Sequence, residues 1–191
     1  MTRLFTIPLL LTALLASAQE FKLGSKVSDF NVLDLDGKTV SFSSLRGPIT
    51  VVTFISTQCP VSNSYNERMN AVYKDYNAKG AKFIFVNANR TESASEVRDH
   101  AKRVGFAFPV YKDPDNVLAD RFNAQVTPES YVIDSEGIIR YHGSIDDSQN
   151  ESNVHTQRLR LALDAVLAGK PIETAETKAF GCSIKRVRRS S

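Results

Sequence analysis

The 191-residue chain has few of the residues on which several protein classes depend. It has two cysteines, Cys59 and Cys182, and three histidines, and no pair of cysteines has the close spacing of a metal-binding motif. The formal net charge of +3 is slight, which argues against a nucleic-acid partner. Beyond the N-terminus, no apolar run is long enough to span a membrane, and the chain has no repeats. We therefore expect one globular domain with no bound metal or cofactor.

The N-terminus has the composition of a secretory signal peptide. It carries a positive charge at Arg3, then an apolar run over residues 4–15, then small residues that predict cleavage after Ala18. The run is short for a bilayer span, so retention as an uncleaved anchor is the minor alternative. We expect residues 1–18 to be removed and the mature protein to be secreted or periplasmic, in an oxidising compartment.

One stretch, residues 49–69, places a cysteine between an expected strand and an expected helix. Residues 50–56 are apolar and β-branched, which is typical of a buried strand. From about Ser62 to Lys79, apolar and aromatic residues recur at helical spacing. Cys59 lies at the junction, where the free N–H groups and dipole of a helix favour the nucleophilic thiolate. A buried structural cysteine is the alternative.

The rest of the mature chain alternates expected strands and helices. In order, these are a hairpin around Asp36-Gly37, a strand at 82–87, helices at 93–104 and 117–122, strands at 131–134 and 138–142, and a helix at 154–167. A helix between two successive strands implies parallel pairing. The order predicts an α/β domain over residues 19–170, with a central mixed sheet flanked by helices, an N-terminal hairpin and a C-terminal tail over residues 171–191.

Three short motifs in this framework resemble the thioredoxin-like superfamily. They are FISTQCP at residues 54–60, VTPE at residues 126–129, and YVID at residues 131–134 with Gly137 in the following turn. Within that superfamily the chain is similar to the redoxin group, which includes alkyl hydroperoxide reductases and thiol-specific antioxidants. The resemblance covers about residues 21–169 and implies a thioredoxin-like fold and a thiol-dependent oxidoreductase.

The resemblance also implies the parts of an active site. Pro128 would be a cis-proline that faces the reactive Cys59, although a cis X–Pro bond is otherwise the exception. The backbone beside this proline, at Thr127, would pair with a bound substrate chain, which is a short β-augmentation.

The chain departs from the patterns of both thioredoxins and peroxiredoxins. Where thioredoxin has its second cysteine, three residues after the first, this chain has Ser62, so the motif contains no local dithiol. Peroxiredoxins have a proline seven residues before the reactive cysteine and a threonine or serine three before it; here these positions are Val52 and Ser56. Either the Ser56 or the Ser62 hydroxyl could donate to a thiolate or satisfy the local backbone, and for Ser62 we expect helix capping.

Turnover by thiol–disulfide exchange needs a second thiol, and Cys182 is the only internal candidate. Phe180 and Ile184 are expected to dock the tail on the domain, and Gly181 to let it bend. We hypothesise that Cys59 attacks and Cys182 resolves. A permanent disulfide that ties down the tail is one alternative, and two cysteines that never meet is another.

The expected function is therefore an exported thiol–disulfide oxidoreductase that acts on protein or small-molecule disulfides with an external thiol reductant. A peroxiredoxin-like thiol peroxidase that reduces hydroperoxides is the first alternative. A copper-handling module that uses His100, His142 or His155 is the second, and a binding module with a vestigial Cys59 is the third.

Overall fold

The computed structural model describes residues 21–188, so the expected signal peptide lies outside the described residues. Strands and helices alternate along the chain. The strands are β1 (Asn31–Leu33), β2 (Thr39–Ser41), β3 (Ile49–Phe54), β4 (Ala81–Asn87), β5 (Val110–Lys112), β6 (Val126–Thr127), β7 (Glu129–Ile133), β8 (Ile139–Gly143) and β9 (Cys182–Ser183). The helices are α1 (Phe42–Leu45), α2 (Pro60–Asn63), α3 (Asn66–Asn77), α4 (Ala94–Val104), α5 (Val117–Arg121) and α6 (Arg158–Leu167), with a 3₁₀ turn η1 (Glu151–Asn153).

The central sheet is mixed, and its strand order is β2-β1-β5-β4-β3-β7-β8. β3 pairs in parallel with β4, and β4 with β5, whereas β7 and β8 continue the sheet in antiparallel pairing. The hairpin of β1 and β2 extends the opposite edge. The expected mixed sheet, the parallel crossover and both hairpins are thus confirmed.

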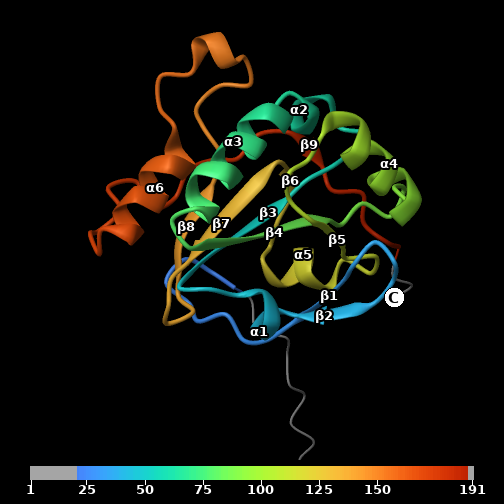
Figure 1. Ribbon diagram of the computed structural model, residues 1–191, viewed down its shortest axis with the longest axis horizontal. Helices are drawn as coiled ribbons and strands as arrows, with labels where there is room; N and C mark the ends of the chain where they lie inside the picture. Colours follow the sequence, from blue (N-terminus) through green and yellow to red (C-terminus); the bar gives the residue numbers. More distant parts are fainter. Residues whose placement is uncertain (1–20, 189–191) are drawn as a thin grey trace, which may run out of the picture.

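Two hydrophobic cores lie on the two faces of this sheet. The β3 side chains alternate between them, with Val52 and Phe54 in one core and Val51 in the other. The core with Val51 is completed by α3, α4 and α6, and the core with Val52 by α1 and α5. Figure 1 shows α2, α3 and α4 on one side of the sheet and α1 and α5 on the other. β3 is buried on both faces, which explains why residues 50–56 form a continuous apolar run in the sequence.

The prediction of a single helix from about Ser62 to Lys79 is wrong, because the structure has two helices here, α2 and α3. Polar side chains at the break bond to the nearby backbone: the Asn63 amide donates to the Thr57 carbonyl, and the Ser64 hydroxyl to the Val61 carbonyl. Such local bonds compete with helical ones. The helix that follows Cys59 is therefore the single turn α2, and α3 begins after Ser64 and Tyr65.

The C-terminal tail has more structure than its lack of periodicity indicated. Residues 182 and 183 form β9, which pairs with β6 in a second, two-stranded sheet. Ile184 is buried in the same core as Val52, while Phe180 packs against the other core, which confirms both expected docking residues. The tail, red in Figure 1, lies beside α2 and β6. No helix within residues 21–188 has the length and apolar character to cross a membrane.

Candidate active site

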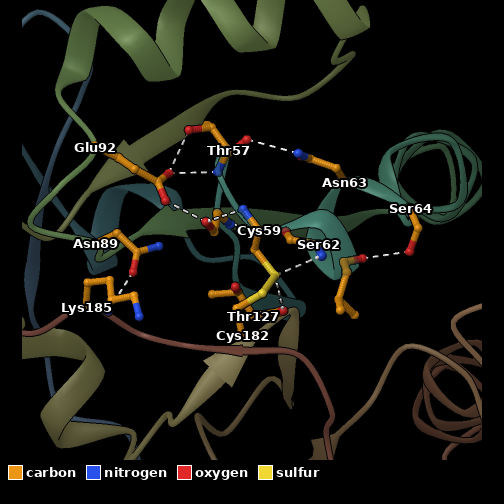
Figure 2. The surroundings of a disulfide bond; sticks show 12 residues. Thr57, Cys59, Ser62, Asn63, Ser64, Asn89, Glu92, Thr127, Cys182 and Lys185 are labelled. Atoms are coloured by element: carbon orange, nitrogen blue, oxygen red, sulfur yellow. Dashed lines mark hydrogen bonds between the residues drawn. A yellow bond between two sulfur atoms is a disulfide. The ribbon is translucent and has the colours of Figure 1, made fainter.

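Cys59 lies where β3 ends and α2 begins, and its side chain is 3% exposed. It occupies the N-cap position of α2, with Pro60 in the first turn, where a missing N–H has no cost. Its sulfur accepts the backbone N–H of Ser62 at 3.3 Å and lies 3.5 Å from the carbonyl oxygen of Thr127. Figure 2 shows these groups converging on the sulfur. The N–H of Ser62 is thus the backbone donor that α2 directs at this sulfur.

Cys59 and Cys182 are joined by a disulfide, with their Cα atoms 5.8 Å apart. β9 carries Cys182 to this position by pairing antiparallel with β6, so that Thr127 lies opposite Cys182. The N–H of Ile184 continues the pairing by donating to the Gln125 carbonyl. The alternative in which the two cysteines never meet is therefore wrong.

The Thr127–Pro128 peptide bond is cis and lies opposite Cys59, as the resemblance implied. Thr127 is buried, and its hydroxyl has no hydrogen-bond partner within residues 21–188. Its backbone pairs with the tail. A Cβ atom added at Gly181 would overlap the Thr127 carbonyl, so this glycine permits a close approach of the two backbones, and the chain also bends at this residue, as expected.

The hydroxyl groups of Ser56 and Ser62 serve the backbone and do not contact the sulfur. The Ser62 hydroxyl accepts the N–H of Ser56 at 3.1 Å, and the Ser56 hydroxyl accepts the N–H of Cys59 at 3.0 Å. The expectation that Ser62 caps the helix is wrong, because Cys59 holds the capping position and its sulfur accepts the Ser62 N–H. The two serines shape the loop that carries Cys59.

A buried carboxylate, Glu92, holds this loop from behind, and the sequence analysis missed it. It accepts hydrogen bonds from the Ser56 hydroxyl at 2.5 Å, from the N–H and hydroxyl of Thr57 at 2.7 Å each, and from the Asn87 amide at 2.6 Å. Burial acts to raise the pKa of Glu92, but these hydrogen bonds outweigh it, so the pKa lies below its ordinary value. Glu92 is therefore an anion in the protein interior, compensated by its donors.

Lys112 supports the same region from the end of β5. Its ammonium group donates to the side-chain oxygen of Asn87 and to the carbonyl oxygens of Asn89 and Glu92. Burial lowers the pKa of Lys112, and the negative charge of Glu92 raises it in part. Glu92 follows the parallel strand β4, and Lys112 is the last residue of the parallel strand β5. Because the carboxyl ends of parallel strands meet at one edge of a sheet, this placement was the signal in the sequence that could have identified both residues.

A second buried carboxylate, Glu129, follows the cis-proline. It accepts the N–H groups of Gln125 and Val126, the Tyr131 hydroxyl, and the His142 ring at 2.6 Å. Burial acts to raise the pKa of Glu129, but the hydrogen bonds led by His142 outweigh it and keep the pKa below its ordinary value. Glu129 thereby positions the strand β6 that pairs with the tail.

The histidines do not gather at one place in the structure. His142 contacts the carboxylates of Glu129 and Glu176, while the His100 ring contacts Arg103. Within residues 21–188, no three histidine, cysteine or acidic side chains lie together in a way that could hold a metal ion. The copper-handling alternative therefore gains no support from the geometry.

Comparisons with known proteins agree with this site. The model of the AhpC/TSA family matches residues 23–142. The thiol-disulfide oxidoreductase ResA of Bacillus cereus (strain ZK / E33L) is 29% identical over 122 residues, which are 64% of this chain and 69% of that protein.

Two solved structures extend the likeness over most of the chain. A hypothetical protein from Sinorhizobium meliloti 1021 is 30% identical with a TM-score of 0.80, and the match covers 88% of this chain and 97% of that one. An uncharacterized conserved protein from Geobacillus kaustophilus is 28% identical with a TM-score of 0.82, and covers 89% and 95% respectively.

Proposed function

The chain belongs to the AhpC/TSA family and is a thiol-dependent oxidoreductase of the thioredoxin-like superfamily, and from this premise we propose that Cys59 is its nucleophile and Cys182 its resolving thiol. The observation that carries the proposal is the disulfide between these two residues, beside the cis Thr127–Pro128 bond. The named relative, a thiol-disulfide oxidoreductase, supports disulfides as the substrate class.

The proposed reaction has two exchange steps. In the reduced protein, the Cys59 thiolate attacks one sulfur of a substrate disulfide, forms a mixed disulfide, and releases the other substrate sulfur as a thiolate that takes a proton from water. The Cys182 thiolate then attacks the Cys59 sulfur and releases the second substrate thiolate. The substrate gains two electrons, the protein is left with the 59–182 disulfide, and an external dithiol reduces it again.

The neighbouring groups are proposed to prepare Cys59 for this attack. The Ser62 N–H donates to the sulfur and favours its charged form. Ser56 and Glu92 hold the loop in place, and Thr127 and Pro128 supply the surface opposite the sulfur. The buried position of the sulfur fits a nucleophile that is protected while its disulfide is formed.

Export is part of the proposal. Residues 1–18 have the composition of a cleavable signal peptide, residues 19–170 would be the redoxin domain, and residues 171–191 its tail. A disulfide between the two cysteines of the chain supports an oxidising compartment such as the periplasm or the outside of the cell. N-terminal sequencing of the secreted protein should begin at Gln19, and an intact N-terminus would contradict export with cleavage.

The experiment that tests the roles uses the variant Cys182→Ser. Incubation with a protein disulfide substrate should trap mixed disulfides at Cys59, visible on a non-reducing gel and by mass spectrometry, because no internal thiol resolves them. The matched control, Cys59→Ser, should trap none. Undiminished multiple turnover of Cys182→Ser with a dithiol reductant would contradict the resolving role.

The peroxidase alternative has less support. The peroxidatic motif has a proline seven residues before the cysteine, where this chain has Val52, and the hydroxyl three residues before it, that of Ser56, donates to Glu92. Consumption of hydrogen peroxide by the reduced protein, measured against Cys59→Ser, separates the two activities.

A further inference from the structure

The tail occupies the strand edge beside Cys59 that a substrate chain needs. Its pairing with β6 places Cys182 opposite Thr127 and Ser183 opposite Val126. An added strand at a free edge is a common way for a protein to bind an extended peptide. We infer that the tail is a built-in copy of the substrate, and that the reduced protein takes extended protein segments containing Gly-Cys, with an apolar residue two positions after the cysteine. This inference rests on the proposed function.

The glycine requirement comes from a steric contact. A Cβ atom on Gly181 would overlap the carbonyl oxygen and carbon of Thr127 and approach the nitrogen of Pro128. All three atoms belong to the backbone beside the cis bond, and Glu129 holds that segment through the N–H groups of Gln125 and Val126. These backbone atoms cannot move aside as the end of a flexible side chain could. Binding of a segment with any residue other than glycine before its cysteine is therefore disfavoured.

The positions on either side of the Gly-Cys pair differ in what they accept. Ile184 is 7% exposed and lies in the same core as Phe122 and Ala124, so this position selects an apolar side chain. Ser183 is exposed and can be any residue. Phe180 lies with its ring centroid 6.3 Å from that of Tyr65, so an aromatic residue fits before the glycine.

The backbone beyond the cysteine is also bound. The Lys185 carbonyl accepts the N–H of Arg90, and the Lys185 N–H donates to the side chain of Asn89 at 2.6 Å. Both contacts are made by the peptide backbone of Lys185, and neither involves its side chain. A substrate segment can therefore make the same contacts whatever residue it has at this position. Figure 2 shows the bond between Lys185 and Asn89 near the disulfide.

One strand edge can hold one chain at a time, so catalysis becomes an exchange of strands. The substrate segment displaces the tail from β6 when its cysteine is joined to Cys59. When Cys182 attacks the Cys59 sulfur, the tail returns to β6 and the substrate segment leaves with its thiol. The chemical steps are those of the proposed function, and the inference adds which protein segments can enter them.

The test uses the Cys182→Ser chain and two hexapeptides, Phe-Gly-Cys-Ser-Ile-Lys and Phe-Ala-Cys-Ser-Ile-Lys. Each peptide carries its cysteine as a mixed disulfide with thionitrobenzoate, so attack by Cys59 on the peptide sulfur releases the coloured thiolate. We expect the glycine peptide to react at least about tenfold faster than the alanine peptide, from the cost of overpacking. A third peptide with Asn in place of Ile should also react more slowly than the first.

The outcomes separate this inference from the proposed function. Equal rates for the glycine and alanine peptides, or no reaction of either peptide while the free thionitrobenzoate disulfide reacts with Cys59, would overturn the inference and leave the proposed function standing. Absence of reaction with all of these disulfides would contradict both.

A second measurement tests the same contact inside the intact chain. In Gly181→Ala, the equilibrium constant for forming the 59–182 disulfide in a glutathione redox buffer should fall about tenfold or more. The matched control is Ser183→Ala, on the other side of Cys182, which is exposed and should leave the constant unchanged. An unchanged constant in Gly181→Ala would overturn the inference.

Discussion

The two cysteines of the disulfide are attached to the molecule in very different ways. Cys59 follows the central strand β3 and is held by Ser56, whose hydroxyl is bonded to the buried Glu92. Cys182 lies on the two-residue strand β9, which pairs with β6 alone. Moving Cys59 would disrupt a buried carboxylate and the middle of the sheet, whereas lifting Cys182 with the tail breaks the pairing with β6 and the tail's other hydrogen bonds and exposes Ile184.

This difference suggests a division of labour between the two sulfurs. A nucleophile works best when its surroundings are fixed in advance, while a resolving thiol must leave the site to let the substrate enter. Local opening costs least where few buried contacts are lost. The proposed roles of Cys59 and Cys182 follow this order of cost.

The largest expected effect separates the two thiols themselves. Cys59→Ala should lose disulfide reductase activity by several orders of magnitude, because no other residue can take the place of the nucleophile. Cys182→Ala should keep a fast first step, measured in a single-turnover assay with an activated disulfide, and lose only turnover. Equal loss of the first step in both variants would remove the proposed distinction.

The fixed side depends on the charge of Glu92. Glu92→Gln should lower the free energy of unfolding by about 2–3 kcal/mol at neutral pH, because an amide cannot accept all of the hydrogen bonds that the carboxylate accepts. Urea unfolding measures the change. Glu173→Gln, an exposed acidic residue, is the matched control and should leave the stability nearly unchanged.

The same variant has a defined pH dependence. The pKa of Glu92 is lowered in the folded protein, so ionised Glu92 contributes stability that is complete above its ordinary value of 4.5 and is lost as the pH falls through the folded pKa. The stability difference between the unsubstituted protein and Glu92→Gln should therefore shrink below about pH 4.5. A difference that grows on acidification would contradict the assignment.

The docking of the tail that carries Cys182 should depend on the buried side chain of Ile184. Ile184→Ala removes most of a buried side chain, which typically costs about 2–5 kcal/mol, and much of this loss should fall on tail docking. The 59–182 disulfide should then be at least about tenfold easier to reduce in a glutathione buffer. Val187→Ala, a half-buried position further along the tail, should change the equilibrium less.

The smallest effect is expected for the ion pair at the end of the tail. Arg186 lies 2.7 Å from Asp120, but both side chains are about one third exposed. Exposed pairs contribute about 0.2–1 kcal/mol and weaken with salt. Arg186→Gln should shift the same redox equilibrium by less than about fivefold, and the shift should diminish in high salt.

The pattern of strands and helices was predictable because it depends on local periodicity. The parallel crossover, both hairpins and the flanking helices followed from apolar spacing and from turn residues such as Asp36-Gly37. The helix after Cys59 was predicted too long, because the side-chain bonds of Asn63 and Ser64 that divide it depend on where neighbouring carbonyls lie.

The sequence by itself placed a cysteine after a buried strand and left Cys182, in the tail, as its one possible partner within the chain. Only the tertiary structure decided what surrounds that cysteine: Glu92 behind it, Thr127 opposite it, and a glycine where the tail crosses the cis peptide. The reason is physical. Periodicity acts between residues close along the chain, whereas the burial of a carboxylate and the clash of a Cβ depend on segments that only the folded sheet brings together.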